Sequence, residues 1–169
     1  LALFLLLIGL IIRGVSFEYR SKDSAPAWRN RFDWMIAIGS FLAALLLGAA
    51  FANLARGVPI DENMMFTGNL FTLLNPYGLL GGLTTVAIFL LHGANFLGLK
   101  LEGELRERVN VFAKKLWIGA TVLYVALGIF TYAAGFWARG VVNPGIVPIA
   151  AVAVLFAAGY FINQKMEGW

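Results

Sequence analysis

Three ionisable residues near the start of the chain, Arg13, Glu18 and Asp33, are the first candidates for chemistry. Each lies at the edge of a long apolar run, where a pair of charged side chains can orient the polar segment or help proton entry. Arg13 and Asp33 belong to consecutive apolar runs that meet the same polar segment, so an ion pair between them is geometrically feasible. Such charges more commonly serve topology alone, and both roles stay open.

A second set of residues forms a stripe at steps of three and four, which is the spacing of one helix face. Its members are Gly78, Gly82, Thr85, Phe89, His92 and Asn95. Gly78 and Gly82 form a GxxxG pair, which is typical of closely packed membrane helices. His92 is the only histidine, so a b-type haem held by two imidazoles lacks its second ligand here. We therefore expect Gly78, Gly82 and His92 to serve helix packing.

Composition indicates an integral membrane protein. The chain has 169 residues, of which 60% are hydrophobic and 13% charged, and a typical globular domain has about 25% charged residues. It has no cysteine, which excludes disulfides and thiolate-held iron–sulfur clusters within this segment. No metal-ligand spacing or phosphate-binding loop is present. We expect no bound cofactor, no metal and no complete active site in this chain.

The apolar runs predict an all-α fold, a polytopic bundle of about five transmembrane helices. The expected spans are residues 1–16, 34–54, 77–99, 116–136 and 145–162. Asp33 is the expected N-cap of the second span, and Asn75 with Pro76 is expected to start the third. A short re-entrant or interfacial piece is expected at Leu70–Leu74. We expect one membrane domain over 1–169. Because the chain starts inside an apolar run without Met, we expect it to be a fragment of a longer subunit.

Charge asymmetry predicts the orientation of the helices. Cations outnumber acids between Arg13 and Asp33 and again between Lys100 and Lys115, and such segments stay in the cytoplasm. We therefore expect residues 17–33 and 100–115 to be cytoplasmic. Segment 55–75 and the turn at 138–144 carry few cations and are expected outside. The net charge of +4 follows from these short basic segments, so nucleic-acid binding is not expected.

Several polar segments make the chain resemble subunit II of cytochrome bd-type quinol oxidases. The resemblance is colinear and covers roughly residues 1–108. It is carried by RGVSFEYRSK (13–22), WRNRFDW (28–34), GSF (39–41), NLARGVPID (53–61), TGNLFTLLNPYGLLGGL (67–83) and HGANFLGLKLEGEL (92–105). Hydrophobicity alone would not generate these motifs. From Val109 onward only the pattern of membrane helices is recognisable.

The resemblance implies a subunit of a respiratory complex in the prokaryotic inner membrane. In that family, subunit I carries haems b and d and the quinol site, and subunit II has no haem ligands and stabilises the assembly. The complex oxidises quinol, reduces dioxygen to water and takes protons from the cytoplasm. The implied partners are subunit I, membrane lipid and small accessory subunits. The family's first two helices, with their acidic motifs, would precede Leu1.

The resemblance also implies roles for individual positions. Arg13, Glu18 and Asp33 match charged positions of the family motif, which makes them candidates for a proton route or a subunit interface. Polar positions of the family's outer loop match Asn53, Asn69 and Asn75.

Two other classes of protein fit the sequence less well. A secondary transporter or channel fragment would need discontinuous helices and an ionisable residue near the bilayer midplane, and only the region from Asn75 to Gly78 suggests this. A cytochrome that binds haem by itself is disfavoured because the chain has a single histidine, His92.

Overall fold

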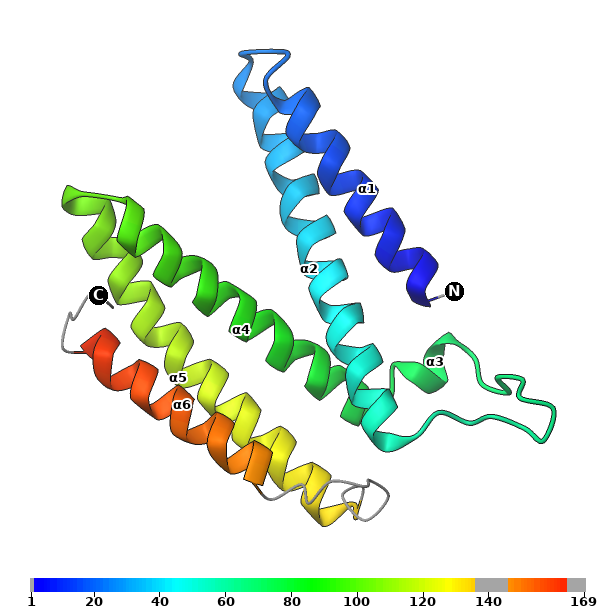
Figure 1. The fold of residues 1–169 in the computed structure, drawn as a ribbon. Coiled ribbons are helices and arrows are strands. Elements are labelled where there is room, and N and C mark those ends of the chain that lie inside the picture. The colour runs from blue at the N-terminus through cyan, green and yellow to red at the C-terminus, as the bar shows by residue number, and fades with distance from the viewer. Residues whose placement is uncertain (1, 136–145, 164–169) are drawn as a thin grey trace. The chain divides into compact units, whose positions relative to one another are not determined.

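The computed structural model describes residues 2–135 and 146–163, with side chains described over 2–135 and 150–160. This part of the chain forms helices and has no strand beyond one isolated bridge between Ile60 and Phe66. The all-α class is therefore confirmed. The helices in Figure 1 are α1 (Ala2–Arg20), α2 (Pro26–Arg56), α3 (Leu70–Leu73), α4 (Pro76–Lys100), α5 (Gly103–Ala133) and α6 (Ile146–Asn163).

Four of these helices, α1, α2, α4 and α5, are long and apolar enough to cross a membrane. Helix α6 contributes a shorter apolar stretch, Ala150–Tyr160. The polytopic bundle is confirmed, and a described helix overlaps each of the five expected spans. The expected outer turn at 138–144 lies outside the described residues.

The predicted polar loops are largely helical. Between α1 and α2 only Ser21–Ala25 are non-helical, and between α4 and α5 only Leu101 and Glu102. The expectation of a loop over residues 17–33 was therefore wrong, whereas residues 100–115, expected as a partly helical loop, are helical outside Leu101 and Glu102. The reason is that Lys, Arg and Glu are good helix formers, so the helices continue past their apolar segments.

The prediction that Asp33 caps the second span was also wrong. Helix α2 begins at Pro26, after Ala25, and Asp33 lies within it. Proline suits a first helical turn because its missing N–H would be unpaired there anyway. The predicted start of the third span is confirmed, because the Asn75 side chain accepts a hydrogen bond from the Gly78 N–H at 2.9 Å. The expected short piece at Leu70–Leu74 is helix α3.

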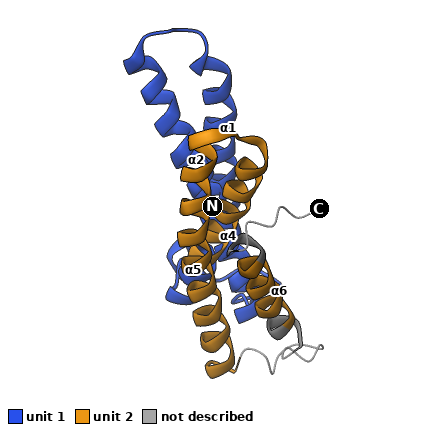
Figure 2. Cartoon of the chain, turned by 90° about the vertical axis from the view of Figure 1, so that its left-hand side faces the viewer, with its two compact units in different colours: residues 1–82 blue, residues 83–169 orange. Residues whose placement is uncertain are grey.

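The chain divides into two compact units, residues 1–82 and 83–169 (Figure 2). In the first unit, α1 and α2 form an antiparallel hairpin that closes on two glycines. A Cβ placed on Gly39 would lie 2.6 Å from the Gly9 carbonyl oxygen. Ser16, two helical turns after Gly9 on α1, is fully buried, and its hydroxyl donates to the Ile12 carbonyl at 2.6 Å. The helix backbones therefore approach as closely as small residues allow.

The second unit is built around contacts of α5. Its buried cluster consists of Leu91, Ala94, Ala113 and Ala120, with Trp117 packed against it. The Trp117 indole N–H donates to the Leu155 carbonyl of α6 at 2.7 Å, and Gly159 provides the space for the ring. Each unit thus has its own packing. The single membrane domain over 1–169 stays a prediction.

Candidate functional site

The polar ends of α1 and α2 are joined by an ion pair between Arg20 and Asp33. The Arg20 Nε lies 2.5 Å from Asp33 Oδ1 and its Nη2 lies 3.2 Å from Oδ2, which makes the pair bidentate. Both side chains are about half exposed. Arg20 ends α1, and Asp33 comes just before the apolar part of α2, which begins at Trp34. The hydrogen bond from Arg20 lowers the pKa of the Asp33 carboxyl and raises the pKa of Arg20. Asp33 is therefore held ionised.

Aromatic side chains close the same end of the hairpin. The Trp28 indole N–H donates to the Tyr19 carbonyl at 3.0 Å. The Phe32 ring lies 4.9 Å from the Trp28 ring and 6.4 Å from the Tyr19 ring, measured between centroids. Glu18 is exposed and pairs with Lys22 on the same helix at 3.5 Å. The hairpin end is therefore ordered by contacts among its own residues.

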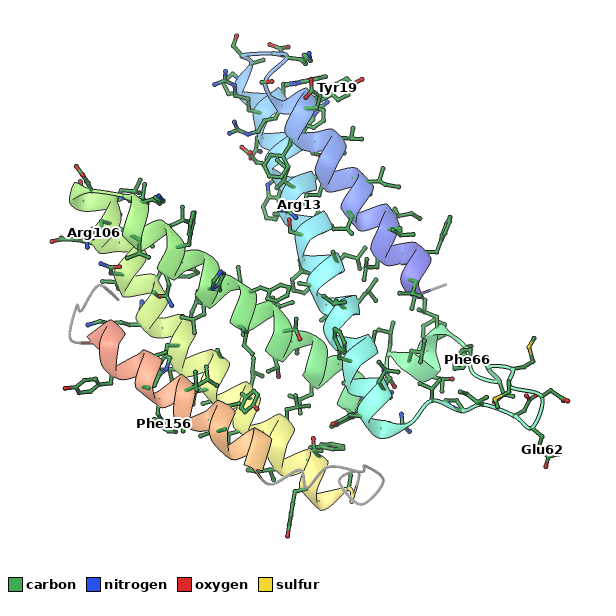
Figure 3. All side chains as sticks on the ribbon, viewed as in Figure 1. Arg13, Tyr19, Glu62, Phe66, Arg106 and Phe156 are labelled. Carbon is green, nitrogen blue, oxygen red and sulfur yellow. The ribbon has the colours of Figure 1, made fainter. Side chains whose placement is uncertain are left out.

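Arg13 lies apart from this pair. The structure places its Cβ 3.3 Å from the position of a Cβ on Gly39, which is inside the apolar part of α2. Its guanidinium carbon lies 5.6 Å from the centroid of the Phe17 ring, one turn nearer to the polar end (Figure 3 labels Arg13). This arrangement fits an arginine whose head reaches from the membrane interior towards the boundary. The suggested pair with Asp33 does not form, because Arg20 occupies that carboxylate.

At the opposite end of α2, two asparagines join α2, α3 and α4. Asn53 is 4% exposed, and its side-chain amide donates to the carbonyls of Ala49 at 2.7 Å and Leu73 at 2.6 Å. The Asn75 amide donates to Asn53 Oδ1 at 2.7 Å. Every described polar side-chain atom buried in this region has a partner. The cluster is therefore a fully satisfied polar joint, which is stable in a low-dielectric setting.

The glycines of α4 lie against this joint and against α2. A Cβ on Gly78 would lie 2.7 Å from the Asn53 amide nitrogen, and one on Gly82 would lie 2.6 Å from the Leu45 carbonyl oxygen. Gly81 makes a similar approach to Ala52. His92, in contrast, is exposed on α4 and forms no hydrogen bond with another described residue. The stripe therefore packs at its glycine end, and a packing role of His92 stays a prediction.

Comparison with known proteins identifies the family of the chain. The family model for cytochrome bd terminal oxidase subunit II matches residues 1–169. The chain belongs to this family. It is 41% identical over 133 residues to cytochrome bd-I ubiquinol oxidase subunit 2 of Escherichia coli (strain K12), covering 76% of the chain and 35% of the relative. It is 32% identical over 172 residues to cytochrome bd ubiquinol oxidase subunit 2 of Bacillus subtilis (strain 168), covering 98% and 49%.

A probable cytochrome oxidase subunit 2 of Haemophilus influenzae is 38% identical over 136 residues, covering 78% of the chain and 36% of the relative. The chain thus spans about a third to a half of the length of these curated relatives. The resemblance read from the polar motifs is confirmed.

This subunit II chain does not supply both histidines of a bis-imidazole haem site. A bis-imidazole site needs two histidines, and His92 is the only one in the sequence. Among the described residues, no group of three His, Asp or Glu side chains could hold a metal ion. No step of a reaction is therefore assigned to a cofactor on this chain.

Sequence reasoning missed several residues that organise this subunit II segment. Gly9 and Ser16 are two helical turns apart on α1, and Gly39 lies opposite Gly9 on α2. Gly81 adds to the contact between α4 and α2. The seven-residue spacing from Gly9 to Ser16 was a usable signal, because small residues at helical spacing mark close approach. No comparable signal in the sequence selects Arg20 as the partner of Asp33, because several other arginines lie nearby in the sequence.

Proposed function

We propose that the chain forms part of the non-haem subunit of a cytochrome bd-type terminal oxidase. The complex oxidises quinol and reduces dioxygen to water, with haems b and d carried by the partner, subunit I. The observation that carries this proposal is the family match over residues 1–169. The names of two relatives, both ubiquinol oxidase subunits, support quinol as the substrate of the complex.

Within the complex, this chain stabilises the haem-bearing subunit. Its contacts support such a role, because backbones approach at glycines and the buried amides of Asn53 and Asn75 are fully paired. A rigid helical surface can hold a partner helix without loss of conformational entropy on assembly. The exposed apolar faces of α1 and α2 are available for lipid and for subunit I.

We place the polar helix ends at residues 17–33 and 100–115 in the cytoplasm of a prokaryotic cell, because these segments have the greatest cationic excess. We assign Arg13 a part in proton uptake through its fixed positive charge, since a guanidinium stays protonated and does not itself carry the proton. Arg13 is within the apolar part of the hairpin and forms no ion pair with another described residue. Glu18 and Asp33 already have cationic partners, so we assign them to the ordering of the cytoplasmic end.

An optical spectrum tests the division of labour. The full-length subunit is purified alone and together with subunit I. We expect haem bands and quinol-dependent oxygen consumption only from the complex. Haem bands from this subunit alone would overturn the proposal.

Turnover of the complex tests the role of Arg13. Arg13→Ala is expected to lower oxygen consumption at unchanged haem content, and Arg13→Lys to retain part of it. Arg31→Ala, which removes an exposed cation from α2, is the matched control and is expected to leave turnover unchanged. Equal turnover in Arg13→Ala and the control would leave Arg13 with a topological role only.

A transporter or channel fragment has no comparable support. Helix α2 runs unbroken for 31 residues and α4 for 25, whereas such a fragment would need helices that are interrupted within the membrane. The region from Asn75 to Gly78, which suggested a break, is the capped start of α4.

A further inference from the structure

The segment that joins α2 to α4, residues 57–75, exposes several large apolar side chains although it lies outside the helices that could cross a membrane. We refer to it as the lateral loop; it includes α3. The exposed fraction of the residue is 86% for Met64, 79% for Phe71, 65% for Met65 and 58% for Ile60. Scattered single apolar residues on a surface need no explanation, but a group of this size on one short segment marks an interaction surface.

Both ends of the lateral loop are fixed to one buried residue, Asn53. The Gly57 N–H donates to the Asn53 carbonyl at 2.9 Å where the chain leaves α2. The Asn53 side chain donates to the Leu73 carbonyl where the chain returns. The loop therefore starts and finishes at the end of α2.

The middle of the lateral loop is shaped by Asp61. One carboxylate oxygen, Oδ1, accepts from the N–H groups of Asn63 at 2.9 Å and Met65 at 2.8 Å. Ile60 and Phe66 form an antiparallel bridge, and Met64 takes a left-handed conformation with φ of 61°. The apolar side chains are thus presented by a backbone with its own hydrogen bonds, so binding needs little further ordering.

The loop has two unlike sides. It extends sideways from the end of α2 instead of continuing along the helix axis (Figure 1). Figure 3 shows Phe66 on the side towards which α1 and α2 extend, and Glu62 at the outer end on the opposite side. Phe66 therefore lies on the side of the loop where the α1–α2 hairpin lies, and the acidic Glu62 lies on the other side.

We propose that the lateral loop is an interfacial membrane anchor, in which Ile60, Met64, Met65 and Phe71 enter the boundary between lipid headgroups and acyl chains. We choose lipid as the occupant because the surface continues the exposed apolar surface of α2, a helix that could cross a membrane. Phe51 and Leu54, in the last turns of α2, are 63% and 67% exposed, and the loop extends from the same end. Segments of this kind lie about 5–10 Å into the boundary region. The anchor does not depend on which membrane face the loop occupies, nor on the oxidase activity.

Spin labelling of the assembled oxidase tests this proposal. The sequence has no cysteine, so Met64→Cys and, separately, Phe71→Cys each add one labelling site; signal from the unmodified complex is subtracted. The complex is reconstituted in vesicles of phosphatidylethanolamine and phosphatidylglycerol. Collisions of the label are measured with oxygen, which concentrates in lipid, and with a water-soluble nickel chelate. Glu62→Cys is the matched control on the opposite side of the loop.

We expect the ratio of oxygen to nickel collisions to be several-fold higher at position 64 and at position 71 than at position 62. The depth calculated from that ratio should be about 5–10 Å. A nickel accessibility at 64 and 71 equal to that at 62 would overturn the proposal. Protection of both positions from oxygen and nickel together would also overturn it, since a protein partner would then cover the surface. Quinol oxidation by the same samples is measured separately, so a failure of the proposed enzymatic role would not be mistaken for a failure of the anchor.

Discussion

Replacement of Gly82 by alanine tests how closely α4 must approach α2. The new Cβ would lie 2.6 Å from the Leu45 carbonyl oxygen, about 0.8 Å short of the 3.4 Å at which ordinary contact begins. Because that oxygen belongs to the backbone, no side-chain rotation relieves the clash, and the helices must separate. Overpacking of this kind costs about 1–3 kcal/mol.

Alanine also favours a helix over glycine by about 1 kcal/mol, so a control must remove that term. Gly93→Ala lies on the same helix and meets nothing within 4 Å. The difference between Gly82→Ala and Gly93→Ala therefore isolates the cost of close approach. We expect the purified oxidase with Gly82→Ala to unfold several degrees below the one with Gly93→Ala. Gly82→Leu should prevent stable assembly. Equal melting temperatures for the two alanine variants would refute the reasoning.

Three further predictions concern other contacts. Asn53→Ala should expose the lateral loop to faster proteolysis at a cost of about 1–3 kcal/mol, since it removes the short hydrogen bond to the Leu73 carbonyl and one acceptor of the Asn75 amide, which keeps its bond to the Thr72 carbonyl; Asn63→Ala is the control, and equal cleavage rates would contradict the expectation. Trp117→Phe keeps an aromatic side chain but removes the donor to Leu155 and part of the ring that packs at Gly159, so thermal unfolding should report a loss of at least about 1 kcal/mol, and no loss would argue against that bond. Asp33→Asn should lower the melting temperature slightly at neutral pH. Because Arg20 lowers the pKa of Asp33, the difference from wild type should persist above the usual carboxyl pKa and vanish as the pH falls through the lowered one; a difference that grows in acid would contradict this sign.

Hydropathy predicted the membrane-crossing segments well but not the length of the helices. The apolar run after Trp34 marks where α2 lies in hydrocarbon. The helix itself begins at Pro26, because backbone hydrogen bonds continue wherever the side chains tolerate a helix. A hydropathy scan measures affinity for lipid, and it has no term for a polar helical turn that extends into water.

Local capping signals were predictable, whereas long-range partners were not. Asn75 before Pro76 indicated a helix start through chemistry within four residues, and the Gly78 N–H is bonded as expected. The partner of Asp33 depends on how α1 and α2 align across the hairpin, and that alignment is set by the contact of Gly9 with Gly39. Sequence gives the residue types at such a crossing but not the register that brings them together.

The five-residue turn at Ser21–Ala25 has a mechanical consequence. Helix α2 is 31 residues long, or roughly 46 Å at 1.5 Å per residue, which exceeds the ~30 Å of bilayer hydrocarbon. The connection between α1 and α2 is short, and Arg20 is ion-paired with Asp33. A tilt or rotation of either helix within the lipid must therefore also move its polar end in the water. Fused tags or reporters attached at this turn would therefore register movements of the buried portion directly.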